Sequence, residues 1–215
     1  MHPEVLPNTE KNLLKKIACL SQVYQWVLAG GTACALHLGH RISRDLDFFT
    51  NKTFSTDKLF EDLKKLAANL VIESQSEAGL VAWINNSKFS AFYQSYLFVE
   101  PCADFMGAPV AGLADLAAMK LIAISQRGKK RDFVDLYFIL QKVPSLKVAN
   151  VLVSRYGREK INPLHIGKSL VYFADAEGDP EPEFLPPCKV SWTIVKKFFK
   201  SHVRQIVLDI EAILS

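Results

Sequence analysis

The sequence has few cysteines, and their spacing fits neither a zinc site nor a disulfide framework. The four cysteines, Cys19, Cys34, Cys102 and Cys188, stand far apart along the 215 residues. Zinc sites need cysteine or histidine ligands at short, regular spacing, and a chain of this length can build a core without disulfides. We therefore predict reduced thiols in a cytoplasmic protein.

The chain also lacks a long uncharged apolar segment. Its apolar stretches are interrupted by charges or glycine before they reach the roughly 20 residues that cross a membrane. The first residues, MHPEVLPNTE, have neither the basic start nor the apolar centre of a signal peptide. These absences predict a protein without a membrane partner.

Neither sign of charge is in large excess. The formal net charge is +4, with 22% charged and 49% hydrophobic residues, as in an ordinary globular protein. This mildly basic balance permits a polyanionic partner but does not require one, because nucleic-acid binding is indicated by clustered positive charge. The length suits one larger domain or two small ones.

The first half of the chain alternates between helical and strand-like patterns. Helices are predicted over residues 8–22, 32–39 and 56–68, with Asn8 or Thr9 capping the first, and strands over 24–30, 44–50, 69–74, 79–85 and 88–96. The NNS turn signal separates the last two strands. This alternation predicts a sheet with flanking helices.

The second half begins with a loop rich in proline and glycine, residues 100–112. Helices are predicted over residues 113–126, 131–142, 147–156, 163–176 and 191–214, with an acidic, proline-rich loop at 175–187. The simplest organisation is an α/β (α+β) fold. A mixed sheet with helices would occupy residues 1–110, and a helical domain residues 111–215.

Asp45 and Asp47 are two residues apart in a predicted strand. In a strand, residues i and i+2 point to the same face, so the two carboxylates lie close together and repel each other. Mg²⁺ relieves such repulsion and prefers oxygen ligands, and two Mg²⁺ ions can flank an in-line nucleotidyl transfer. The pattern predicts a two-Mg²⁺ site, and the alternative is a pair of solvated side chains at a strand end.

Gly30, Gly31 and Thr32 stand between a predicted strand and a predicted helix. Glycines let the backbone approach a phosphate closely, and a helix N-terminus offers free N–H groups and a positive dipole. The hydroxyl of Thr32 adds a further polar group at the same point. The three residues predict a phosphate-binding turn, although a plain tight turn would have the same sequence.

Lys120 and Asp135 are single charges within apolar helical segments. Charged side chains are rarely buried without a partner. One interpretation is an ion pair between the two helices, and the other is that Lys120 reaches a cleft and contacts a triphosphate. The sequence favours neither.

The RGKKR segment, residues 127–131, carries four positive charges. Such a segment is usually a solvated turn, but it can also contact the phosphates of an RNA backbone. Asp132 follows it and is predicted to cap the next helix.

Taken together, GGTACALHLGHRISRDLDFF and LADLAAMKLIAISQRGKKRDFVDLYFIL resemble the AbiEii/AbiGii-type nucleotidyltransferases. These are the toxin components of type IV toxin–antitoxin systems, within the polymerase-β-like nucleotidyltransferase superfamily. The resemblance covers residues 27–50 and 113–140 well, and the region between them more loosely.

The resemblance implies a nucleotidyltransferase core followed by a helical domain, and Mg²⁺-dependent transfer of a nucleotide from an NTP to an acceptor. It implies RNA, specifically tRNA, as the acceptor, and an antitoxin protein as a partner. By the resemblance, Asp45 and Asp47 bind metal and are catalytic together with Lys120 and Asp135. The nucleotide-binding residues that it implies are Gly30, Gly31, Thr32, Ser43, Lys120, Arg131 and Asp132.

A third carboxylate normally stands on a later strand in this superfamily, where it orients or deprotonates the attacking hydroxyl. The corresponding predicted strand offers Ser90 and Ala91 instead, and Glu100 and Asp104 fall in the loop beyond it. Two alternative functions therefore stay open. One is a degenerate domain that binds nucleotide or RNA without catalysis, and the other is a metal-dependent nuclease.

Overall fold

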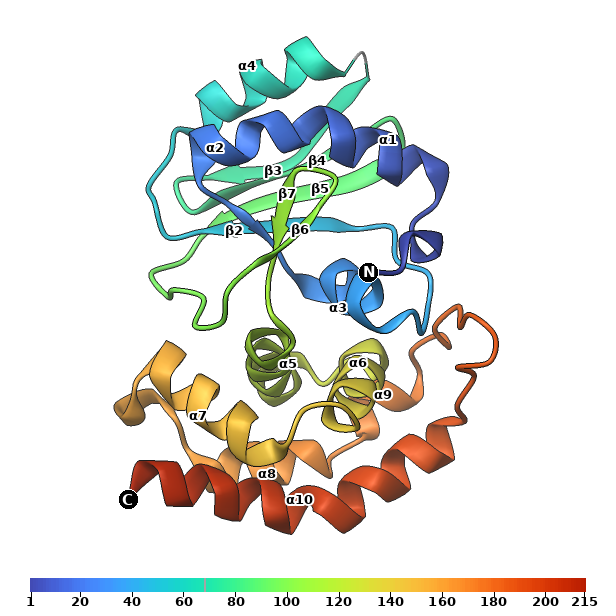
Figure 1. Cartoon of the computed structure of the whole chain (residues 1–215), viewed down its shortest axis with the longest axis vertical. Coiled ribbons are helices and arrows are strands. Elements are labelled where there is room, and N and C mark those ends of the chain that lie inside the picture. The colour runs from blue at the N-terminus through green and yellow to red at the C-terminus, as the bar shows by residue number, and fades with distance from the viewer. Residues whose placement is uncertain (68) are drawn as a thin grey trace.

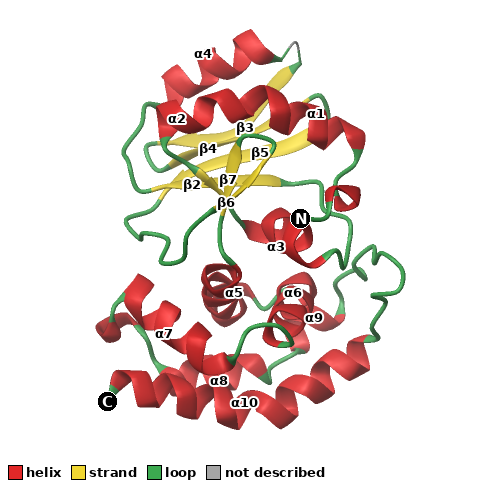
Figure 2. Ribbon diagram, viewed as in Figure 1, coloured by secondary structure: helices red, strands yellow, loops and turns green. Residues whose placement is uncertain are grey.

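The computed structural model describes residues 1–67 and 69–215, and Figures 1 and 2 show a sheet with flanking helices above a group of further helices. The strands are β1 (Val27–Leu28), β2 (Leu46–Thr50), β3 (Leu70–Ser76), β4 (Gly79–Ile84), β5 (Ser87–Tyr93), β6 (Ala103–Phe105) and β7 (Ala108–Val110). The longer helices are α1 (Asn8–Ile17), α3 (Gly30–Leu38), α4 (Thr56–Leu66), α5 (Leu113–Arg127), α6 (Lys130–Leu140), α7 (Ser145–Tyr156), α8 (Pro163–Leu170) and α10 (Trp192–Leu214). Shorter helical turns are Pro3–Val5, Ala18–Leu20, α2 (Ser21–Tyr24), Arg158–Lys160 and α9 (Ala174–Glu177). The predicted α/β (α+β) class is confirmed.

The described strands form one mixed sheet in the order β3-β4-β5-β2-β1-β7-β6. β2 is central, parallel to β5 and antiparallel to β1, and β7 pairs with β1 in parallel. Side chains alternate along β2, so that Leu46 and Phe48 are fully buried in the core, whereas Asp47 is half-buried on the other face. The sheet therefore presents Asp47 on the face where α3 packs.

The helices that follow the sheet pack beneath it, with α5 and α6 nearest to α3 (Figure 1). α10 lies across α7 and α8 at the far side. One buried apolar core includes residues of both halves, such as Leu28, Phe48, Leu121 and Phe199. The division into domains at residues 110 and 111 stays a prediction. None of the described helices is long and apolar enough to cross a membrane.

Several predicted boundaries were wrong. The loop predicted over residues 100–112 contains the hairpin of β6 and β7, because three-residue strands are too short to show an alternating pattern. Its turn uses Met106 and Gly107, both at positive φ. α1 has Pro7 as its N-cap with no side-chain cap. The helix predicted over residues 163–176 is divided into α8 and α9, and the predicted end of the third helix at residue 68 lies outside the described residues.

Candidate active site

Asp45 and Asp47 lie at the start of β2, in the middle of the sheet. Asp47 is the second residue of the strand, and Asp45 immediately precedes the strand. The side chain of Asp45 is 40% exposed. The two-residue spacing brings the carboxylates together on the face of α3, as the sequence predicts.

The surroundings of Asp47 leave its negative charge poorly compensated. Burial raises the pKa of Asp47 above its ordinary value; a hydrogen bond from Ser90 opposes this, and the charge of Asp45 adds to it. A divalent cation between the carboxylates would supply the missing positive charge, so the two residues fit Mg²⁺. In residues 1–67 and 69–215, no group of three or more His, Cys, Asp or Glu could hold a metal ion. Water and substrate phosphates would therefore complete the ligand set.

Ser90 occupies the position on β5 that faces Asp47. The parallel register pairs Asp47 with Ser90, and Ser90 Oγ donates a hydrogen bond to Asp47 Oδ1 at 2.6 Å. This is the strand on which the resemblance leads one to expect a third carboxylate. The hydroxyl instead holds one oxygen of Asp47 in a fixed orientation.

Glu100 and Asp104 lie away from Asp47. Glu100 accepts a hydrogen bond from the backbone N–H of Ala114 at 2.8 Å and pairs with Lys147, so it holds the start of α5. Asp104 lies on β6, three strands from β2 in the sheet, or about 14 Å away at ordinary strand spacing. Neither residue takes the place of the third carboxylate.

Gly30 and Gly31 form the first turn of α3, directly beside the aspartates. Gly30 has a φ of +65°, and a Cβ there would lie 2.6 Å from Asp47 Oδ2. A Cβ on Gly31 would lie 2.5 Å from Nη2 of Arg41. Both contacts favour glycine, and the first N–H groups of a helix have no partner within the helix. This turn combines free N–H groups with adjacent carboxylates, a combination suited to a metal-bound phosphate.

Thr32 and Ser43 lie inside the protein. Thr32 is fully buried, and Ser43 is 7% exposed. Thr32 Oγ1 lies 2.8 Å from Ser43 Oγ and also hydrogen-bonds the carbonyl oxygen of Asp45. The two hydroxyls fix the segment that carries Asp45 against the start of α3. A direct contact of either with nucleotide stays a prediction.

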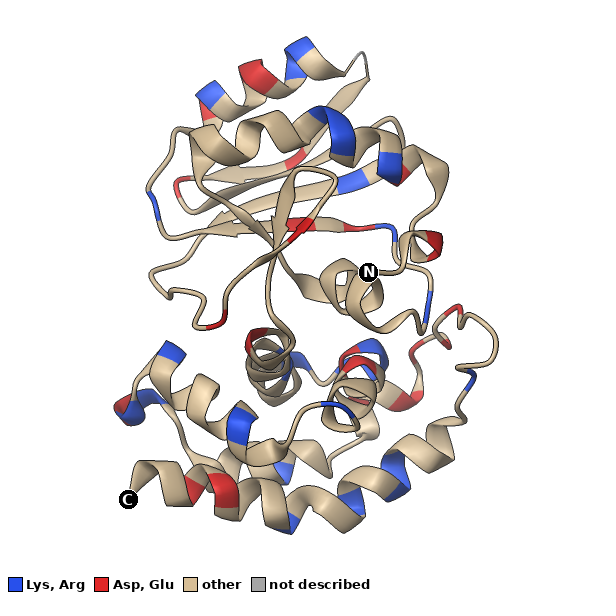
Figure 3. Ribbon diagram, viewed as in Figure 1, with Lys and Arg blue, Asp and Glu red and all other residues tan. Residues whose placement is uncertain are grey.

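Behind the glycine pair, five charged side chains alternate in sign, and we call them the charge chain: Arg127, Asp132, Lys120, Asp135 and Arg41. Lys120 Nζ lies 2.8 Å from Asp132 Oδ1 and 2.7 Å from Asp135 Oδ2. Arg41 donates to both oxygens of Asp135, at 2.7 and 2.9 Å, and Arg127 Nε donates to Asp132 at 2.9 Å. Figure 3 shows both signs of charge on α5 and α6, beneath the sheet.

The ion pair between Lys120 and Asp135, one of the two interpretations that the sequence leaves open, is present. Asp135 is fully buried, and the side chain of Lys120 is 7% exposed. Burial would raise the pKa of Asp135, but Arg41 and Lys120 outweigh it and hold the pKa well below its ordinary value. Asp135 is thus an internal anion that ties α6 to the segment before β2. Its catalytic role and a phosphate contact by Lys120 stay predictions.

Asp132 does not cap α6, contrary to the prediction. The helix begins at Lys130 with Lys129 as its N-cap. Asp132 therefore lies within the first turn. Its fully buried carboxylate points inward to Lys120 and Arg127 because these cations offset the cost of burying it.

The four cations of the RGKKR segment each have a carboxylate partner. Arg127 pairs with Asp132, Lys129 with Asp179, Lys130 with Glu181 and Arg131 with Asp45. The segment is therefore not a freely solvated turn. Arg131 Nη1 lies 3.5 Å from Asp45 Oδ2 with its side chain 54% exposed, so it can meet phosphates that approach β2.

Arg41 and His40 are the residues of the site that sequence reasoning missed. His40 Nε2 lies 2.8 Å from Asp135 Oδ1, and the ring is fully buried. The one signal was a histidine–arginine pair in the short segment between the glycine pair and the aspartates. No pattern in one sequence reveals that these side chains turn inward to a helix 95 residues away.

Solved structures share this fold. JHP933 from Helicobacter pylori matches with a TM-score of 0.55 at 19% identity, over 98% of this chain and 92% of the other. MenT4, a nucleotidyltransferase toxin from Mycobacterium tuberculosis H37Rv, matches with a TM-score of 0.55 at 17% identity, over 97% and 96%. The chain therefore shares the fold of these structures, and in it the paired aspartates stand at the central strand beside a glycine turn.

Sequence comparison identifies the family to which the chain belongs. The family described as "Nucleotidyl transferase AbiEii toxin, Type IV TA system" matches residues 12–97 and 93–205. The protein aq_aa25 of Aquifex aeolicus (strain VF5) is 36% identical over 205 residues, which cover 93% of this chain and 97% of that protein. The chain belongs to the AbiEii family of nucleotidyltransferase toxins of type IV toxin–antitoxin systems.

Proposed function

We propose that the chain transfers a nucleotide from an NTP to RNA, specifically tRNA, in a Mg²⁺-dependent reaction at Asp45 and Asp47. In this reaction an acceptor hydroxyl oxygen forms a bond to the α-phosphorus and its proton passes to solvent, while the bond from the α-phosphorus to the oxygen that bridges to the β-phosphate breaks and pyrophosphate leaves. The observation that carries the proposal is the contact of the glycine turn with Asp47, because it brings a phosphate-binding turn to a carboxylate pair.

Asp45 and Asp47 would hold the metal, and Ser90 would keep Asp47 in the orientation that binding requires. When bound, Mg²⁺ neutralises charge on the phosphates and lowers the pKa of the attacking hydroxyl. The backbone N–H groups at Gly30 and Gly31 would bind phosphate oxygens. Arg131, whose contact with Asp45 is long and whose side chain is half exposed, would bind a phosphate of the nucleotide.

The charge chain would position these groups. Arg41 lies directly against Gly31, and Asp135 fixes the guanidinium from two sides. The positive charge of Arg41 adds to the positive end of the α3 helix dipole, and both favour an anion at the glycine turn. Lys120 would act mainly through this chain. In the cell, we propose that an antitoxin protein opposes this activity in the cytoplasm.

A transfer assay distinguishes this function from the alternatives. The protein is incubated with each labelled NTP, Mg²⁺ and total RNA. We expect label on RNA in the tRNA size range. RNA shortening without NTP would instead identify a nuclease, and saturable NTP binding without transfer would identify a non-catalytic binding domain.

A further inference from the structure

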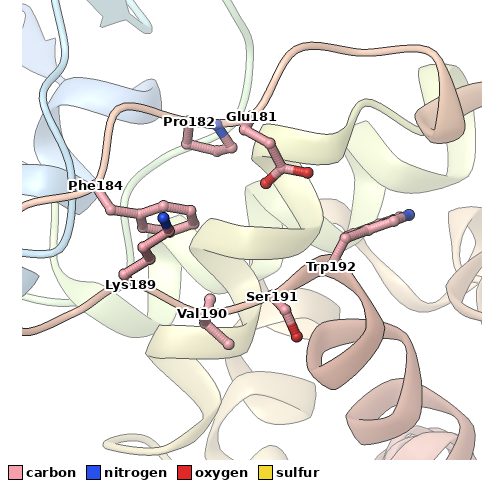
Figure 4. Close-up of a pocket in the computed structure, with 7 residues that line it drawn as sticks. All are labelled: Glu181, Pro182, Phe184, Lys189, Val190, Ser191 and Trp192. Atoms are coloured by element: carbon pink, nitrogen blue, oxygen red, sulfur yellow. The ribbon is translucent and has the colours of Figure 1, made fainter.

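A pocket lies outside the catalytic face, where the acidic loop after α9 meets the start of α10. Its volume is about 470 Å³, and Glu181, Pro182, Phe184, Lys189, Val190, Ser191 and Trp192 line it. Figure 4 shows the rings of Phe184 and Trp192 on opposite sides of the pocket, with the carboxylate of Glu181 between them. This volume is within the range of small-molecule sites.

The lining combines aromatic faces with one carboxylate and one ammonium. Trp192 packs edge-on against Phe133 and Phe173 of the core, which fixes the ring. The ammonium groups of Lys130 and Lys196 lie 5.6 and 5.9 Å from the centre of that ring. A rigid aromatic surface with cations beside it suits a flat, polar ring that is attached to an anion.

The acidic loop does not repel such a ligand strongly, because three of its carboxylates, those of Glu177, Asp179 and Glu181, pair with lysines. Glu177 pairs with Lys196 at 2.7 Å, and Asp179 with Lys129 at 3.3 Å. Glu181 lies 3.4 Å from Lys130 Nζ. At the rim, Lys189 is exposed.

The pocket is joined to the segment that leads to the catalytic aspartates. Phe184 forms an antiparallel bridge with Arg41, and the backbone N–H of Ile42 donates to the backbone carbonyl oxygen of Glu183 at 2.8 Å. Arg44, next to Asp45, pairs with Glu183 at 2.8 Å. The loop that lines the pocket is therefore fixed to the short segment that ends at Asp45.

We propose that this pocket binds an unstacked nucleobase between Phe184 and Trp192. Bases outside a helix stack on aromatic side chains and form hydrogen bonds through their edges. Here Glu181 can accept a hydrogen bond from the base, and Lys189 can donate one. The base belongs either to the acceptor RNA or to the NTP, and in this the proposal rests on the proposed function. Phe184 is then a binding residue, although it is remote from the metal site in sequence.

Tryptophan fluorescence tests the pocket directly. The chain has three tryptophans; Trp26 is fully buried, and Trp83 is exposed on β4. In a Trp83→Phe variant, quenching by an added ligand therefore reports on Trp192. The probes are a single-stranded RNA of about ten nucleotides and, separately, each NTP. Quenching by RNA alone supports a base of the acceptor, and quenching by one NTP alone supports the base of the substrate.

Phe184→Leu keeps an apolar side chain but removes the stacking face. We expect it to weaken binding of the quenching probe about tenfold, since stacking on an aromatic side chain contributes roughly 1–3 kcal/mol per base. The same probe's KM in the transfer assay should rise similarly, while kcat changes little. Phe60→Leu, the same change at a partly buried ring on α4, is the control and should have no effect.

The two proposals fail separately. If the wild-type protein transfers nucleotide but no probe quenches Trp192 and Phe184→Leu leaves every KM unchanged, the pocket proposal is wrong. If RNA or NTP quenches Trp192 while no transfer occurs, the proposed reaction is wrong and the base site stands.

Discussion

Two pairs of aspartates in this chain have opposite surroundings. Asp45 and Asp47, at the start of β2, have one arginine at 3.5 Å and one hydroxyl at 2.6 Å as their partners. Asp132 and Asp135, on α6, are fully buried and contact three cations between them. Burial raises the pKa of Asp47, whereas Arg41 and Lys120 overcome burial to hold the pKa of Asp135 low.

This difference indicates that the pair at β2 serves metal binding, whereas the pair on α6 serves the stability of the fold. A carboxylate pair with too little positive charge near it has capacity for a cation from solution. A buried carboxylate that is already paired has no such capacity, and its removal leaves uncompensated charge inside the protein. We therefore propose that the aspartates at β2 bind the metal and that those on α6 position the site.

The largest expected effect is the loss of stability in Asp135→Asn. The change leaves Arg41 and Lys120 buried without their shared anion, which should cost about 3–5 kcal/mol of the free energy of unfolding. Asp45→Asn makes the same chemical change at a partly exposed position and should stay within about 0.5 kcal/mol. Urea unfolding of both variants measures the comparison, and equal losses would contradict the assignment.

Ser90→Asp should make the stability of the protein depend on the charges at β2, as it already depends on those of α6. A third carboxylate beside Asp47 adds like charge, which should destabilise the protein in EDTA by about 1–4 kcal/mol. Mg²⁺ should reverse the loss, since it neutralises the cluster. Ser90→Asn has a similar shape without the charge and serves as the control. A loss that Mg²⁺ does not reverse would place the metal elsewhere.

The smallest expected effect is a pH dependence of stabilisation by Mg²⁺. Because the pKa of Asp47 is raised, the ionised carboxylate that the metal needs is lost at a higher pH than for an ordinary aspartate. The rise in Tm caused by Mg²⁺ should be full above that pKa and disappear as pH falls through it. In Asp47→Asn the Mg²⁺ effect should be small at every pH; a full effect there would show that Asp47 is not a ligand.

The pKa of Asp135 in the charge chain is shifted in the opposite direction from that of Asp47, so Asp135 loses its charge at a lower pH. The pKa of Asp135 is lowered on folding, so its stabilising contribution is present at neutral pH and is lost only as pH falls through that lowered pKa. Acid titration of unfolding should therefore show the Mg²⁺ effect disappear before the fold itself weakens. If the Mg²⁺ effect and the stability of the fold were lost at the same pH, the separate roles of the β2 and α6 aspartates would be contradicted.

Local patterns were sufficient to predict the parts of the site that are close in sequence. Asp47 lies in β2, Asp45 immediately precedes that strand, and Gly30 begins the preceding helix, so their short separation in sequence indicates that they meet. The Lys120–Asp135 ion pair was one of two interpretations of the sequence, but the contact of Arg41 with Asp135 could not be predicted, because these residues come from segments 94 residues apart and meet only through tertiary packing. The pairing of β7 with β1 was missed for the same reason.

The most direct test of the central claim is nucleotide transfer by Asp45→Asn/Asp47→Asn. Asp57→Asn/Asp104→Asn, two changes of the same kind at exposed residues, is the control. With labelled NTP, Mg²⁺ and RNA, we expect the control to match the wild type and the site variant to lose at least about a hundredfold in rate, with its unfolding transition retained. A folded site variant that transfers nucleotide at the wild-type rate would contradict the account.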